Sequence, residues 1–259
     1  WVLTSYIVAA AIMTPPTGYL AGRFGLKRLF LVSVVGFTIA SMLCGMAQTL
    51  TQIVLFRVLQ GLFGAALVPL SQTVLLNINP PERQGSAMAL WGVAVMAGPI
   101  LGPVLGGWLT ENYSWRYVFY INLPIGILAF LGMTTFLTES KRNILEKLDW
   151  FGFGTLSLAI GTLQILLDRG EELDWFGSGE IMIEAIVAAS AFYLFLAHTF
   201  TSDKPFVRPS LFRDRNFTAG LLFVAIVGLT YYASLALQPP YLQGLMNYPI
   251  VTAGLVMGP

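Results

Sequence analysis

The segment WGVAVMAGPILGPVLGGW, residues 91–108, decides the fold of this chain. Small residues and prolines recur along it at helical spacing, and they form two adjacent stripes: Gly98, Gly102, Gly106 and Gly107, with Pro99 and Pro103. A helix face without Cβ atoms lets another helix approach closely in a bilayer. Proline removes a backbone donor and bends a helix. The segment predicts a bent, tightly packed transmembrane helix, and a helix that is merely kinked for packing is the alternative.

Composition extends this prediction to the whole chain. Hydrophobic residues make up 56% of it, charged residues only 10%, and the mean hydropathy is +0.73. Because soluble domains carry about 25% charged residues, we expect a polytopic membrane protein. The net charge of +1 gives no sign of a nucleic-acid partner. The single cysteine, Cys44, excludes an intrachain disulfide or a thiolate metal cluster, so we expect it to be a packing residue.

Apolar segments of about 20 residues, the length that spans a bilayer, alternate with short polar turns. The expected spans are 2–21, 29–47, 53–76, 85–108, 117–137, 150–167, 181–200 and 217–239, with a ninth beginning near Thr252. The predicted fold is an all-α bundle of eight complete transmembrane helices and the start of another. The chain lacks an initial methionine and has apolar runs at both ends, so we expect an internal fragment.

Basic residues set the orientation. Eleven of the fourteen lysines and arginines lie in alternate turns, at 22–28, 77–84, 138–149 and 201–216. By the positive-inside rule these turns are cytoplasmic, and residue 1 lies near the outer face. The expected location is the cytoplasmic, or inner, membrane.

The glycine and proline stripes resemble motif C, the antiporter motif in the fifth span of major facilitator superfamily drug exporters. The basic turn GYLAGRFGLKRLF, residues 18–30, resembles motif A of the same superfamily. This resemblance implies gating roles for Gly18, Arg23, Gly25 and Lys27. Gly22 stands where the family usually has an aspartate that helps to lock the two halves together. The lock here would therefore be weaker or use other contacts. On charge alone, any basic inner turn would look similar.

Arg57 lies inside the third expected span. An arginine at the centre of a transmembrane helix costs about 2.5–3.5 kcal/mol, so it normally faces a partner or a wet cavity. A side chain that reaches the outer interface is the alternative. Together with Gln60 and Gly61 it resembles motif B, which implies a role in proton coupling. Arginine keeps its proton near neutral pH, so Arg57 would act on a carboxylate. No carboxylate lies in the first five spans, and we expect it outside this chain.

Two further spans, near 150–167 and 181–200, are joined by the acidic turn LDRGEELDWFGSGE. They resemble the EmrB/QacA-type, fourteen-span branch of drug:proton antiporters, in which two spans are inserted between the halves. The predicted domains are the remainder of the N-terminal half, the inserted pair and the start of the C-terminal half: residues 1–137, 138–200 and 201–259. Glu184 and His198, near the ends of the second inserted span, are expected to be interfacial.

Enzyme classes receive little support, because the sequence has no metal-ligand cluster, phosphate-binding glycine loop or Ser/His/Asp set. The resemblance implies proton-driven export of hydrophobic or amphipathic drugs by alternating access, with no cofactor beyond the proton gradient. Export of a native metabolite or siderophore and a non-transporting bundle are the alternatives. The expected cavity residues are Tyr6, Met13, Met96 and Phe119. The resemblance also implies a periplasmic adaptor and an outer-membrane channel as partners.

Overall fold

A computed structural model describes residues 1–139, 147–249, 252–253 and 256, and these residues form helices and connections without a β-strand. Seven helical segments of the described chain are long and apolar enough to cross a membrane, and Val2–Met13 is a shorter apolar helix. The predicted all-α, polytopic class is therefore confirmed. The predicted ninth span, from near Thr252, falls largely outside the described residues.

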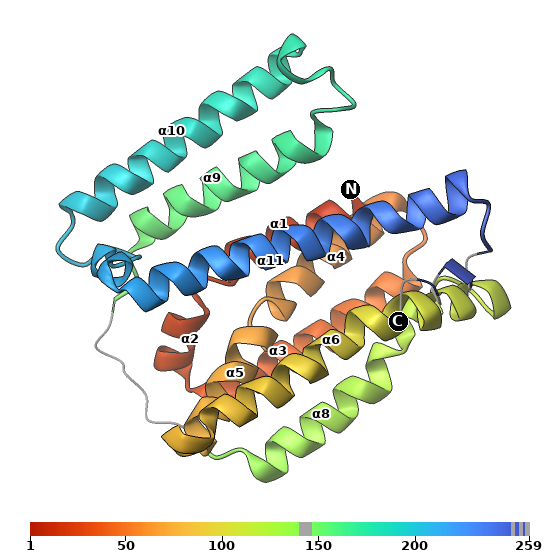
Figure 1. Cartoon of the computed structure of the whole chain (residues 1–259), viewed down its shortest axis with the longest axis horizontal. Coiled ribbons are helices and arrows are strands. Elements are labelled where there is room, and N and C mark those ends of the chain that lie inside the picture. Colours follow the sequence, from red (N-terminus) through yellow and green to blue (C-terminus); the bar gives the residue numbers. More distant parts are fainter. Residues whose placement is uncertain (140–146, 250–251, 254–255, 257–259) are drawn as a thin grey trace. The chain divides into compact units, whose positions relative to one another are not determined.

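Internal contacts divide the chain into two compact units. The first comprises Trp1–Val74 and Tyr120–Arg208. Its main helices are α1 (Val2–Met13), α2 (Thr17–Phe24), α3 (Leu26–Met46), α4 (Leu50–Gly64), α5 (Leu67–Ile78, in large part), α8 (Asn122–Phe136), α9 (Trp150–Arg169) and α10 (Gly179–Thr201). Helix α1 packs against both α4 and α9, and α3 packs against α4 and α8. Helices α9 and α10 lie side by side as a hairpin (Figure 1).

The second unit comprises Leu75–Phe119 and Pro209–Pro259. It contains α6, the short helix α7, a 3₁₀ turn η2, α11 and a π-helical turn η3: Pro81–Asn112, Tyr117–Tyr120, Pro209–Arg213, Arg215–Pro240 and Tyr241–Leu245. Helix α11 packs against η2 and η3. Helix α6 is continuous through both of its internal prolines, and its predicted bend stays a prediction.

Three of the predicted spans are each broken into two helices. A proline ring clashes with the carbonyl group four residues earlier, and it also lacks an N–H donor. Pro69 therefore disfavours helical geometry at Ala65, the residue directly after α4. Pro124 does the same at Tyr120, the last residue of α7. Two consecutive prolines within residues 14–16 separate α1 from α2. Proline therefore favours these breaks, although α6 continues through its own two internal prolines.

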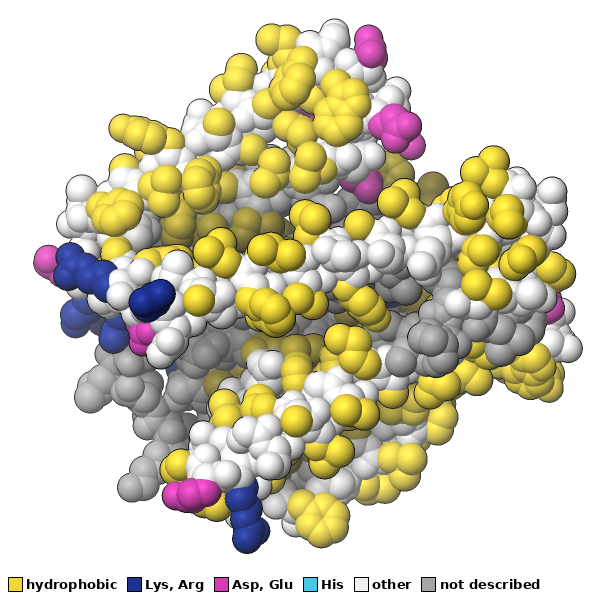
Figure 2. Space-filling model, viewed as in Figure 1, with side chains coloured by type: hydrophobic (Ala, Val, Ile, Leu, Met, Phe, Trp, Pro, Cys, Tyr) yellow, Lys and Arg dark blue, Asp and Glu magenta, His cyan; other side chains and the backbone are white. Residues whose placement is uncertain are grey.

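Apolar side chains cover much of the helix surface. On the face shown in Figure 2 they extend along the helices, while lysine and arginine side chains gather near the start of α11. Inside the first unit, Leu26, Ala66 and Leu70 form a buried cluster at the end of α3 where the basic turn lies. An apolar exterior with charges at helix ends is what a bilayer requires.

Candidate functional site

Arg57 bridges α4 and α1. Helix α4 begins at Leu50, where the Thr49 side chain caps it, so Arg57 lies two turns inside the helix. Its Nε donates to the Val2 carbonyl oxygen at 3.1 Å, one terminal nitrogen donates to Gln60 Oε1 at 2.7 Å, and the guanidinium lies 4.3 Å from the Tyr6 ring centroid. The charge is thus held by a backbone oxygen, a side-chain amide and an aromatic face.

Gln60 connects this cluster to α3. Its side chain is fully enclosed, and its Oε1 also lies 3.8 Å from the Cys44 thiol. Cys44 is buried, as expected of a packing residue. Gly61 lies against the backbone of α1, with Tyr6 and Ala10 directly opposite. The three predicted motif B residues therefore meet where α4 packs against α1 and α3.

A carboxylate also reaches the first turn of α1. Asp168, at the end of the inserted helix α9, accepts a 2.6 Å hydrogen bond from the buried Thr4 hydroxyl. The neighbouring Arg169 pairs with Glu180 and lies 5.4 Å from the Trp1 ring centroid. The α9–α10 hairpin is thus attached by specific polar contacts to the helix that binds Arg57. That the coupling carboxylate lies outside the chain remains a prediction.

The predicted motif A residues form a turn that is tied to α8. Gly25 joins α2 to α3 with a φ of 95°, a conformation that favours glycine. Lys27 Nζ donates to the carbonyl oxygens of Thr134 and Leu137, at 2.9 and 2.5 Å, and so caps the end of α8. The Lys27 backbone N–H donates to Glu139 at 3.2 Å. A carboxylate that sequence reasoning missed therefore lies at this turn.

The remaining motif A positions are more open. Arg23 donates to the Tyr19 hydroxyl at 2.7 Å. A Cβ atom added at Gly18 or at Gly22 would meet no described atom within 4 Å. An aspartate at position 22 would therefore fit sterically, so space does not explain its replacement by glycine.

The motif C residues lie on α6. Among the described atoms, none lies within 4 Å of a Cβ added at Gly98 or Gly102, and one at Gly106 would lie 4.0 Å from Val118. Gly107 is buried, and the Pro99 side chain lies outside the described residues. Close packing of this stripe against another helix stays a prediction, as does the bend at Pro103.

The predicted cavity residues fall in different units. Tyr6 and Met13 lie on α1, with Tyr6 beneath the Arg57 guanidinium. Met96 lies exposed on α6, and Phe119 lies in α7 against Trp115. The structure supports a role beside Arg57 for Tyr6 alone, and the cavity as a whole stays a prediction.

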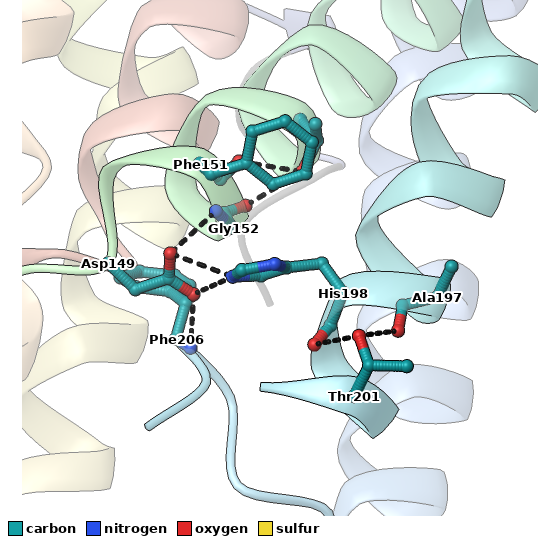
Figure 3. Close-up of polar contacts among 8 residues, drawn as sticks. Asp149, Phe151, Gly152, Ala197, His198, Thr201 and Phe206 are labelled. Atoms are coloured by element: carbon teal, nitrogen blue, oxygen red, sulfur yellow. Dashed lines mark hydrogen bonds and ion pairs between the residues drawn. The ribbon is translucent and has the colours of Figure 1, made fainter. Parts of the chain in front are cut away.

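A polar cluster joins the start of α9 to the end of α10, where the two helices of the inserted hairpin begin and end (Figure 3). Asp149 caps α9 by accepting from the Gly152 N–H at 3.0 Å, and it also accepts from the Phe206 N–H at 2.9 Å. His198 Nε2, from the last turn of α10, lies 2.9 Å from the same carboxylate. Burial raises the pKa of Asp149, but the hydrogen bonds from Gly152, His198 and Phe206 outweigh it and hold the pKa below its usual value.

We expect Asp149→Ala to lower the free energy of unfolding by about 2 kcal/mol, because it removes a helix cap and two further hydrogen bonds. The matched control is Asp214→Ala, since Asp214 caps α11 through Asn216 and Phe217 N–H groups. That variant should lose only about 1 kcal/mol. Thermal unfolding in detergent measures both, and equal losses would contradict a role for His198 and Phe206.

The same variant should show a defined pH dependence. Because the pKa of folded Asp149 is lowered, its contribution is fully present above the unfolded-state value of about 3.9 and is lost as pH falls through the folded value. The difference in unfolding midpoint between wild type and Asp149→Ala should therefore shrink as pH falls below about 4. A difference that stays unchanged down to about pH 2 would contradict this assignment.

Sequence reasoning missed this cluster, although part of the signal was present. An aspartate directly before an apolar helical run, as Asp149 is before α9, is a typical N-cap. The approach of Phe206 and His198 could not be read from the sequence, because both lie about 50 positions away.

Comparison with known proteins gives a consistent result. The family model described as Major Facilitator Superfamily matches residues 1–259. The chain is 43% identical over 260 residues to the multidrug export protein EmrB of Escherichia coli (strain K12), and 41% identical to the fatty acid resistance protein FarB of Neisseria gonorrhoeae. It is 34% identical to multidrug resistance protein 3 of Bacillus subtilis (strain 168). Each match covers 100% of this chain and 51% of the relative, so the chain spans about half their length.

Proposed function

Because the chain belongs to the major facilitator superfamily, we propose that the protein containing it exports hydrophobic or amphipathic drugs across the cytoplasmic membrane. Export would use alternating access and a proton gradient, with no other cofactor. Two similar relatives are named as multidrug export or resistance proteins, which supports this substrate class. The apolar helices and the family make the chain part of a multi-pass membrane protein.

The partly buried Arg57 cluster carries the proposal. A cation two turns inside a membrane helix, bound to Gln60 and to the backbone of α1, is costly, and charges at such positions commonly mark substrate or ion pathways. A non-transporting bundle would need no such charge. Membership of a transporter superfamily favours a transporter over an enzyme. A periplasmic adaptor and an outer-membrane channel are part of the proposal only through the resemblance to the EmrB/QacA-type branch.

The test uses the full-length protein in proteoliposomes, with an imposed proton gradient and a pH dye in the lumen. Adding a lipophilic drug should dissipate the imposed proton gradient, which the dye reports as a change in lumenal pH. Ionophore-treated vesicles, in which the gradient has already collapsed, provide the control. Long-chain fatty acids form a second arm, because one relative is named a fatty acid resistance protein. Proton movement with fatty acids alone, beyond that in protein-free vesicles, would replace drugs as the substrate class. Correctly inserted protein that moves protons with neither class would contradict coupled export.

A further inference from the structure

A groove on the outer surface of the first unit lies between α3 and α8. It has a volume of about 250 Å³, and its lining residues are Val35, Thr38, Ile39, Gly126, Ile127, Phe130 and Leu131. The Thr38 hydroxyl donates to the Val34 carbonyl oxygen at 2.8 Å, so its hydrogen is already used within the helix. The occupant must therefore be apolar along this length.

The shape of the groove follows from one glycine. A Cβ atom at Gly126 would overlap the Thr38 side chain, so α8 approaches α3 closely at this point. Larger side chains on either side remain exposed, including Ile39, Ile127 and Leu131. A close contact flanked by bulky residues leaves a channel that runs along the helices.

A cation stands at the inner end of the same helix face. Arg28 precedes Val35 by seven residues and Ile39 by eleven, and residues at these spacings share one face of an α-helix. At 1.5 Å per residue, the groove begins about 10 Å from Arg28 and extends to about 16 Å. That distance matches the roughly 15 Å depth of one leaflet's hydrocarbon layer.

Arg28 is the basic residue of this face that remains available. The Lys27 ammonium is used by the carbonyl groups at the end of α8, and Glu139 lies against the first N–H groups of α3. Arg28 is exposed and takes part in no hydrogen bond or ion pair with the described residues. Its guanidinium can bind a phosphate through two parallel hydrogen bonds.

We propose that this face is a binding site for a phospholipid of the inner leaflet. The phosphate group pairs with Arg28, and one acyl chain fills the groove between α3 and α8. The site depends on membrane insertion alone, so it stands or falls independently of the proposed drug export.

Native mass spectrometry of the purified full-length protein tests the site. Delipidated protein is mixed with phosphatidylglycerol in one arm and phosphatidylethanolamine in another. Arg28→Gln removes the phosphate partner, and Val35→Trp fills the groove. Each should lower the occupancy of the tightest-bound lipid at least fivefold. Arg83→Gln, at an exposed position in the first turn of α6, should bind lipid as wild type does. Unfolding midpoints confirm that each variant is folded.

Comparing the two lipids shows whether the site recognises the phosphate group or the net charge of the headgroup. Equal binding of both lipids assigns the site to the phosphate itself, and preference for phosphatidylglycerol assigns it to net negative charge. Binding that is unchanged in both Arg28→Gln and Val35→Trp would overturn the proposal. The proposal would also be overturned if lipid binding were lost in Val35→Trp alone and tetraphenylphosphonium displaced the lipid. The groove would then be a site for a hydrophobic cation.

Discussion

Replacing Arg57 with alanine should reduce drug-dependent proton movement at least tenfold while the protein still inserts in the membrane. The substitution leaves the enclosed Gln60 amide and the Val2 carbonyl oxygen without their charged donor, at a cost of about 1–3 kcal/mol each. It also removes the charge that the resemblance to motif B assigns to proton coupling. The measurement is lumenal pH in proteoliposomes containing the full-length variant.

Arg57→Lys separates charge from geometry. A lysine keeps the positive charge, but its single ammonium cannot reproduce two divergent contacts from a planar group. We expect partial activity from this variant and unchanged activity from Arg83→Ala, which removes an exposed cation from the first turn of α6. If Arg57→Ala transported like wild type, the motif B assignment would be wrong, although membership of the superfamily would stand.

Gly61→Ala should have the second large effect, on both stability and transport. An added Cβ would lie 2.5 Å from the Tyr6 carbonyl oxygen and 2.9 Å from the Ala9 Cβ, so α4 and α1 must move apart. Overpacking of this kind costs about 1–3 kcal/mol, which outweighs the gain of about 1 kcal/mol that alanine has over glycine in a helix. The shift would also pull Arg57 away from its contact with Val2.

The matched control is Gly154→Ala on α9, where a Cβ would meet no described atom within 4 Å. The same substitution there should raise the unfolding midpoint slightly, through helix propensity alone. Thermal unfolding in detergent compares the two variants. Equal midpoints for Gly61→Ala and Gly154→Ala would show that α1 and α4 are not held in the close contact described.

Some features could be predicted because they depend on neighbours along the chain. The apolar runs predict spanning helices, and Arg57, Gln60 and Gly61 share a face because they lie three and four residues apart. The spans broken near Ala65 and Tyr120 each have a proline four residues later, but α6 runs through two internal prolines, so proline alone does not predict a break. The domain boundaries and the roles of the motif C glycines remain predictions.

The sequence by itself determined that this chain is a helical membrane protein and which superfamily it resembles, and it predicts which face is cytoplasmic. Length, hydropathy and charge distribution are local properties, and a bilayer acts on them directly. Only the tertiary structure decided which groups Arg57 and Asp149 bind. Their partners are a backbone carbonyl at Val2 and groups at His198 and Phe206, about 50 positions away. Such contacts depend on how helices pack, which no periodicity within a single helix encodes.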